Sequence, residues 1–207
     1  MTASSPSTGA EALLARLLTG VLDRTIMPVV VGEKSTLWLD LHATGDPGHG
    51  SLPPKNQAPL NLARAIAAVS GFGTPRIHPV MKKQFSILAS AAPRPLAVAF
   101  SLLASAAGNV AVRGAADALR SRGAIGALIS DSITATQIAA GYKHNVVPGE
   151  AAASLDCRLL PDTDPDMFVS GLQKRLRRYS VEVTEKARHG GPVSEAGPLY
   201  DVVMDVS

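Results

Sequence analysis

Apolar and polar residues alternate most regularly within the stretch Asn145–Pro161. Along Ala151–Leu159 every second side chain is apolar, and Ser154, Asp156 and Arg158 occupy polar positions between them. A period of two is typical of a β-strand with one buried and one solvated face. Strands of an antiparallel sheet that packs on helices from one side have this environment. The stretch therefore predicts such a sheet, with Arg158 on its solvated face. The simplest role for the guanidinium there is a surface pairing with Asp156 or with a neighbouring strand.

Three further segments complete the predicted sheet. Leu37–Ala43 alternates in the same way, with leucine on one face. Ile129–Ala140 is rich in threonine and isoleucine, and residues 181–184 alternate valine with polar residues. Together with the central stretch these segments give four strands.

Two amphipathic helices are predicted between the strands. Within Asn56–Val69, Leu62 and Ile66 recur at helical spacing. The second helix begins at Asp164, an N-cap residue that proline follows at the first helical position. The resulting order is β-α-β-β-α-β, an α+β, ferredoxin-like fold in which one four-stranded antiparallel sheet carries two helices on one face.

Other segments lie outside this order. Residues 75–128 are predicted as a helical insertion after the first helix, with short helices at Val80–Ala91, Leu96–Ala106 and Ala115–Arg122. Before the sheet we predict a disordered start at residues 1–9. A helix at Glu11–Leu22 and an entry strand at Ile26–Val31 follow it. A last helix begins at Leu199. The predicted domains are therefore residues 1–31, 32–188 and 189–207.

Composition excludes several classes of protein. The 207 residues are 46% hydrophobic and 18% charged, with a net charge of +3, which is typical of a globular protein. The basic residues 174–178 lie in the last turn of a predicted helix, where they suit its dipole, and they lack interleaved aromatic residues for nucleic-acid binding. No apolar run reaches the ~18 residues of a membrane span, and no signal peptide is recognised. The single cysteine, Cys157, lies on an apolar strand face, so we expect a buried thiol and a cytoplasmic protein.

Three motifs in a fixed order resemble the dimerisation, or lid, domain of a family of zinc hydrolases. VGEKSTLWLDL precedes GDPGHGSLPP, and TATQIAAGYKHNVVPGEAAASLDCRLLPDTD follows the insertion. The family includes acetylornithine deacetylase, succinyl-diaminopimelate desuccinylase, carboxypeptidase G and the aminoacylases. The similarity spans residues 29–188. The three motifs in this order are specific, whereas each alone is a weak signal.

The resemblance implies roles for three residues. His49 matches the loop histidine that polarises the scissile carbonyl or stabilises its oxyanion, often in the active site of the partner subunit. Asn145 matches an asparagine that lines the same site. Arg158 matches an arginine that binds a substrate carboxylate. A positioned donor for developing negative charge and a planar fork for a carboxylate are the physical reasons for these roles.

The metal chemistry of the family has no counterpart here. In the family, two zinc ions are held by His, Asp and Glu on a separate catalytic domain, with a Glu as general base. None of the five histidines of this chain lies in a His-x-Asp pattern, and no Glu-Glu pair occurs. We therefore expect no metal site and no cofactor in this chain.

Three functions stay open at this level. The chain is an isolated lid domain that self-associates and is inactive alone, or half of a split zinc hydrolase that needs a catalytic chain in trans, or a stand-alone small-molecule-binding module. The missing metal ligands favour the first. We expect a homodimer through the lid, because a free strand edge is a template for a second copy.

Overall fold

The computed structural model describes residues 32–70, 72–73, 75–105, 114, 116 and 123–191. They belong to two compact units, which are described separately. The sheet unit comprises residues 34–74 and 131–192, and the helical unit contains residues 75–130. The segments predicted at residues 1–31, at Leu199 and across most of Ala115–Arg122 lie outside the described residues. The domain boundaries predicted from the sequence stay predictions.

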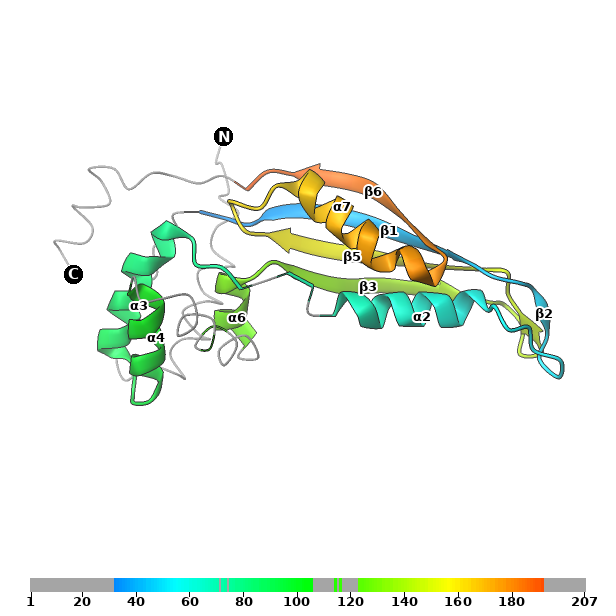
Figure 1. The fold of residues 1–207 in the computed structure, drawn as a ribbon, viewed down its shortest axis with the longest axis horizontal. Helices are drawn as coiled ribbons and strands as arrows, with labels where there is room; N and C mark the ends of the chain where they lie inside the picture. Colours follow the sequence, from blue (N-terminus) through cyan, green and yellow to red (C-terminus); the bar gives the residue numbers. More distant parts are fainter. Residues whose placement is uncertain are drawn as a thin grey trace, which may run out of the picture. The chain divides into compact units, whose positions relative to one another are not determined.

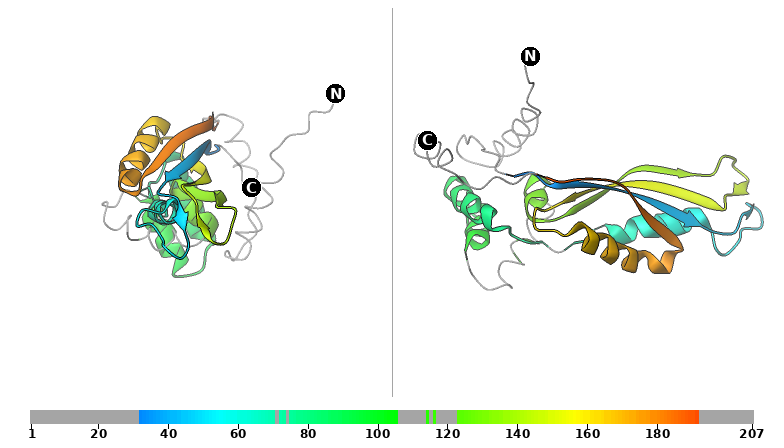
Figure 2. Two further views of the ribbon diagram at one scale, coloured as in Figure 1. Left: turned by 90° about the vertical axis from the view of Figure 1, so that its right-hand side faces the viewer. Right: turned by 90° about the horizontal axis from the view of Figure 1, so that it is seen from above.

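The sheet unit has the predicted α+β fold. Its antiparallel sheet has the strand order β3-β5-β1-β6 (Figure 1). The strands are β1 (Ser35–Thr44), β3 (Ser132–Ala140), β5 (Glu150–Leu159) and β6 (Val181–His189). Helices α2 (Ala58–Val69) and α7 (Pro165–Leu176) cover one face of the sheet, and the short 3-10 helix η1 (Arg177–Tyr179) follows α7 (Figure 2).

The buried face of the sheet consists of the alternating apolar residues. Side chains of β1 and β5 interdigitate with those of α2 and α7, and the fully buried ones include Leu39, Leu41, Leu155, Cys157 and Leu172. Each such leucine contributes roughly 1.5–3 kcal/mol by leaving water. The opposite face carries the polar positions of the same strands. This confirms the predicted faces of β1 and β5, including the buried thiol of Cys157.

Local chemistry sets both ends of α7. The carboxylate of Asp164 accepts hydrogen bonds from the backbone N–H of Asp166 at 2.8 Å and of Met167 at 3.1 Å, as the predicted N-cap requires. At the other end η1 stops at Ser180, whose φ of 52° is in the left-handed region that often terminates helices. β6 therefore starts directly after this turn.

Two predicted boundaries are wrong. The second strand was expected from Ile129, but Ile129 ends helix α6 (Gly123–Ile129), and β3 begins at Ser132. A short apolar run suits a buried helix as well as a strand, so periodicity does not separate the two. The glycine-rich segment GDPGHGS was expected from its sequence to be an irregular loop. That expectation is wrong for Gly48–His49 (β2), which pairs with Val146–Val147 (β4).

The helical unit has its own core. It contains α3 (Pro79–Ala91), α4 (Leu96–Ala104) and α6, so the first two predicted helices of the insertion are present. The rings of Phe85 and Phe100 stack with centroids 5.9 Å apart and are fully buried. None of the helices in the described parts of the chain is both long and apolar enough to span a bilayer.

Candidate functional site

His49 and Asn145 come together at one end of the sheet unit. The pairing of β2 with β4 aligns their backbones, and Gly50 N–H donates to the carbonyl of Asn145 at 2.9 Å. The side-chain atoms Nδ2 of Asn145 and Nε2 of His49 then lie 3.2 Å apart, although 96 residues separate them in sequence. Both side chains are exposed, so a ligand from outside can reach them.

Ser51 and Asn145 contact opposite nitrogens of the His49 ring. The backbone N–H of Ser51 donates to Nδ1 at 3.3 Å, and the Ser51 hydroxyl lies 2.8 Å from the same atom. A neutral ring has only one acceptor nitrogen. Nδ1 accepts from the Ser51 N–H when the ring proton is on Nε2, whereas Nε2 accepts from the Asn145 amide when the proton is on Nδ1. In both states the Asn145 amide has a second N–H, and the tautomer with the proton on Nε2 adds a ring N–H, so the two side chains can offer donors to an oxygen acceptor.

A buried amide holds the base of the loop that carries His49. Asn61 on α2 is only 7% exposed, and its Nδ2 donates to the carbonyl of Thr44 at 2.9 Å and to Oδ1 of Asn56 at 2.8 Å. A Cβ atom at Gly45 would overlap the backbone nitrogen of Ala58, so only glycine fits there. The start and the return of the loop are therefore fixed against α2.

The role of Asn61 was missed at the sequence level. Asn61 follows Ala58 by three residues and precedes Ala65 by four. This helical spacing places it on the buried stripe of α2. A polar residue on an apolar stripe needs a buried hydrogen-bond partner. The place of Asn61 in the apolar pattern of α2 could therefore have predicted a structural hydrogen bond.

Arg158 lies on the open face of the sheet and contacts two side chains. Its Nε is 2.9 Å from Oδ1 of Asp156, its Nη2 donates to Oδ2 of Asp156 at 3.0 Å, and its Nη1 donates to Oγ1 of Thr36 at 2.7 Å. The sequence indicated a surface pairing with Asp156 or a neighbouring strand, and both are present, since Thr36 lies on β1. A guanidinium has five N–H groups, so one N–H on each terminal nitrogen stays available at the end of the fork.

The structure does not bring Arg158 to the other two residues. In the β1–β5 register, Arg158 is opposite Thr36, whereas the loop with His49 begins after Thr44. Eight residues of strand at about 3.3 Å each put roughly 26 Å between these two ends. A small ligand therefore cannot contact both His49 and Arg158 of one copy.

The cysteine next to Arg158 is not a candidate nucleophile. Burial raises the pKa of the Cys157 thiol to about 12, and the carboxylates of Asp156 and Asp131 act in the same direction. A thiol with this pKa stays protonated near neutral pH, and the protonated form is a poor nucleophile.

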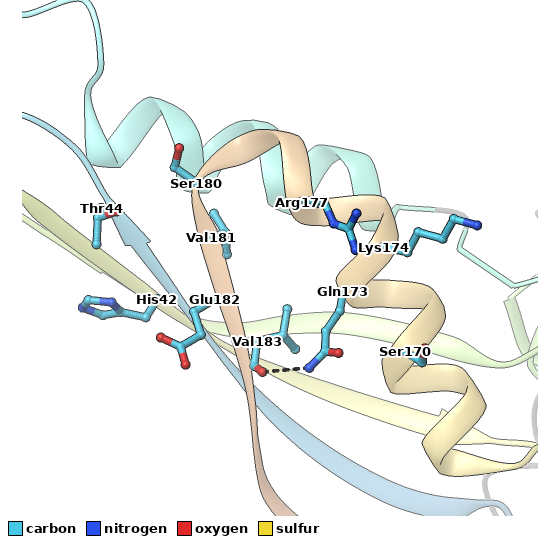
Figure 3. A pocket seen from close by; sticks show the side chains of 10 residues that line it. All are labelled: His42, Thr44, Ser170, Gln173, Lys174, Arg177, Ser180, Val181, Glu182 and Val183. Carbon is cyan, nitrogen blue, oxygen red and sulfur yellow. Dashed lines mark hydrogen bonds between the residues drawn. The ribbon is translucent and has the colours of Figure 1, made fainter.

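A pocket of about 660 Å³ lies elsewhere in the sheet unit, between α7, β6 and β1 (Figure 3). The amide of Gln173 donates to the carbonyl of Val183 across it. Cationic and anionic side chains, Lys174, Arg177 and Glu182, all line it. His49, Asn145 and Arg158 do not, so this pocket is separate from the candidate site.

Among the described residues, no group of three or more His, Cys, Asp and Glu side chains is placed to hold a metal ion. The zinc ions of the resembled family therefore do not fit the residues described here.

A comparison with protein families settles the relationship of the chain. Residues 31–184 match the model of the peptidase dimerisation domain. The chain belongs to the peptidase dimerisation domain family. No curated protein matches the chain. The predicted resemblance is thus confirmed at the level of the domain.

Solved structures with the same fold are longer proteins. An M20 family metallo-carboxypeptidase from Sulfolobus solfataricus is 18% identical with a TM-score of 0.55, and the match covers 85% of this chain and 49% of that one. A protein from Burkholderia cenocepacia, described as an amidohydrolase or peptidase, is 18% identical with a TM-score of 0.52. The match covers 94% of this chain and 36% of that one. A hydantoinase/carbamoylase family amidase from Burkholderia ambifaria is 14% identical with a TM-score of 0.51. The match covers 85% of this chain and 33% of that one. This dimerisation domain therefore spans at most about half of the proteins it resembles.

Proposed function

We propose that the chain is the dimerisation and lid domain of a zinc-dependent peptidase or N-acyl amino acid amidohydrolase, and that it is inactive alone. The observation that carries this proposal is the exposed contact of His49 Nε2 with Asn145 Nδ2, 3.2 Å apart. We assign the proton of the neutral ring to Nε2, so that both side chains present an N–H and form a donor pair. In amide hydrolysis, negative charge develops on the carbonyl oxygen, and two fixed N–H donors stabilise it in the transition state. Membership in the dimerisation domain family supports the choice of reaction.

Arg158 has the complementary role. The free end of its guanidinium fork suits a carboxylate, such as that of an N-acyl amino acid or a peptide C-terminus. Asp156 and Thr36 hold the guanidinium from the side, so its orientation is set before a ligand arrives.

The distance between the two ends of the sheet unit supports a further part of the proposal, that two copies share each active site. Because His49 and Arg158 of one copy are roughly 26 Å apart along the strands, each active site takes the donor pair from one copy and the arginine from the other. The metal ligands and the general base come from a catalytic domain, which the described residues do not supply. Self-association is therefore part of the proposed function.

The edge strand β3 is the surface that we assign to self-association. Among the described strands, none pairs with the outer side of β3, and the Ile138 side chain is largely exposed. An exposed apolar edge strand pairs readily with a second copy, and a two-fold axis closes such a contact.

Sedimentation of the chain at micromolar concentration tests this assembly. We expect a dimer that Ile138→Lys dissociates, because a charge on an edge strand blocks pairing. Arg158→Ala is the control and leaves the dimer intact. A chain that stays monomeric on concentration, or an Arg158→Ala variant that loses the dimer, would contradict the proposal.

Metal content, activity and the protonation of His49 test the proposed inactivity and the proposed donor pair. The purified chain should retain no stoichiometric zinc after dialysis and should not hydrolyse N-acetyl amino acids, because a catalytic zinc needs about three protein ligands. The ¹⁵N shifts of the His49 ring at pH 8 should show a protonated Nε2. Two zinc equivalents with amidase activity would refute the inactivity, and a proton on Nδ1 would refute the donor pair.

A further inference from the structure

The only tryptophan of the chain lies on the open face of the sheet, beside Arg158. Trp38 is 44% exposed, although tryptophan usually buries most of its surface. In the β1–β5 register it is directly opposite Asp156, and Thr36, two positions earlier on β1, is opposite Arg158. Trp38 and Arg158 are thus diagonal neighbours on one face, with Cα atoms roughly 7–8 Å apart, a separation that long side chains bridge.

The surroundings keep the indole both ordered and accessible. The ring of His189 contacts it edge-on, with centroids 5.9 Å apart. The other register neighbour of Trp38 on β6 is Ala187, and Thr134 on β3 is opposite Asp156. These two small side chains leave the indole as the large apolar surface of this part of the face.

Arg158 and Trp38 together present two chemical features to a ligand. The end of the guanidinium fork has two N–H groups without a partner among the described residues, and a carboxylate accepts both. The indole provides an apolar surface one side-chain length away. An amino acid with a free carboxylate and a large apolar side chain offers both features in this spacing.

We propose that Trp38 determines substrate specificity: the carboxylate held by Arg158 belongs to an aromatic or large aliphatic amino acid residue, whose side chain packs on Trp38. This inference rests on the proposed carboxylate-binding role of Arg158. Asp156, directly across from Trp38, adds a selective element. Its negative charge opposes a second carboxylate in the ligand, so N-acyl aspartate and glutamate are disfavoured.

Fluorescence of the chain tests the proposal without any catalytic activity, since Trp38 is the sole tryptophan. With excitation at 295 nm, N-acetylphenylalanine should change the emission along a saturable curve. N-acetylglycine should bind about twofold to tenfold more weakly, which is the range expected for one aromatic contact. N-acetylphenylalanine amide, which has no carboxylate, should cause no saturable change. Arg158→Gln should abolish binding, and Arg64→Gln, on the exposed surface of α2, is the matched control.

NMR of the Arg158 Nε–H signal tests the role of Arg158 separately from the role of Trp38. In the Trp38→Ala variant, N-acetylphenylalanine and N-acetylglycine should shift this signal with equal affinity. If the native chain already binds them equally, the specificity role of Trp38 is wrong and the role of Arg158 stands. If no carboxylate shifts the signal in the native chain, the proposed role of Arg158 fails, and the specificity inference fails with it.

Discussion

The buried amide of Asn61 is the sharpest place to perturb the loop that carries His49. Asn61→Leu keeps the size of the side chain and the helix propensity of α2, but it removes both N–H donors of the amide. The backbone hydrogen bond from Asn61 N–H to the Gln57 carbonyl, 3.0 Å, is unaffected. The change therefore isolates the contacts to the Thr44 carbonyl and to Asn56 Oδ1.

The magnitude follows from these two contacts. A neutral hydrogen bond contributes about 0.5–1.5 kcal/mol net, so losing two lowers the free energy of unfolding by about 1–3 kcal/mol. The loop should lose more local stability than the sheet, since Asn61 bridges the start and the return of the loop. The amide of Asp46, which donates to the Asn56 carbonyl at 2.7 Å, should lose hydrogen-exchange protection first.

Urea unfolding followed by Trp38 fluorescence measures the stability of the sheet unit, because Trp38 lies in that unit. Gln173→Leu is the matched control: it removes one long hydrogen bond of 3.4 Å to the Val183 carbonyl and should cost less than about 0.5 kcal/mol. The reasoning is refuted if Asn61→Leu is as stable as the control, or if the Asp46 amide keeps its native protection.

Three further predictions concern single residues. The raised pKa of Cys157, about 12 against the ordinary 9.0, means that only the unfolded chain releases the thiol proton above pH 9. The thiol's contribution to stability is complete below pH 9 and falls by up to about 1.4 kcal/mol per pH unit from there to pH 12. Urea midpoints of native chain and Cys157→Ala between pH 8 and 11 check this, and parallel pH profiles would contradict it. Gly45→Ala should destabilise the sheet unit by about 2 kcal/mol or more, because its Cβ overlaps the backbone at Ala58; an unchanged urea midpoint would be evidence against this close approach. Asp164→Ala should cost about 1 kcal/mol in thermal or urea unfolding through the lost N-cap of α7, whereas Asp164→Asn should retain most of it.

Features that depend on neighbouring residues were readable from the sequence. The alternation in β1 and β5 predicted both strands and the buried side of Cys157, because side chains of a strand point to opposite faces in turn. Asp164 and the following proline predicted the start of α7, because a cap acts on the first turn of its own helix. From these elements the β-α-β-β-α-β order and the antiparallel sheet followed.

Features that depend on distant residues needed the tertiary structure. The run before Ile129 is helical because it packs into the core of the helical unit, a context that periodicity does not encode. The pairing of β2 with β4 brings His49 to Asn145 across 96 residues, and only the register of the two strands fixes that distance. The same register places Arg158 at the other end of β1. The resemblance assigned all three residues to active sites. The folded chain brings two of them together and holds Arg158 apart, since the length of a strand sets which side chains can meet.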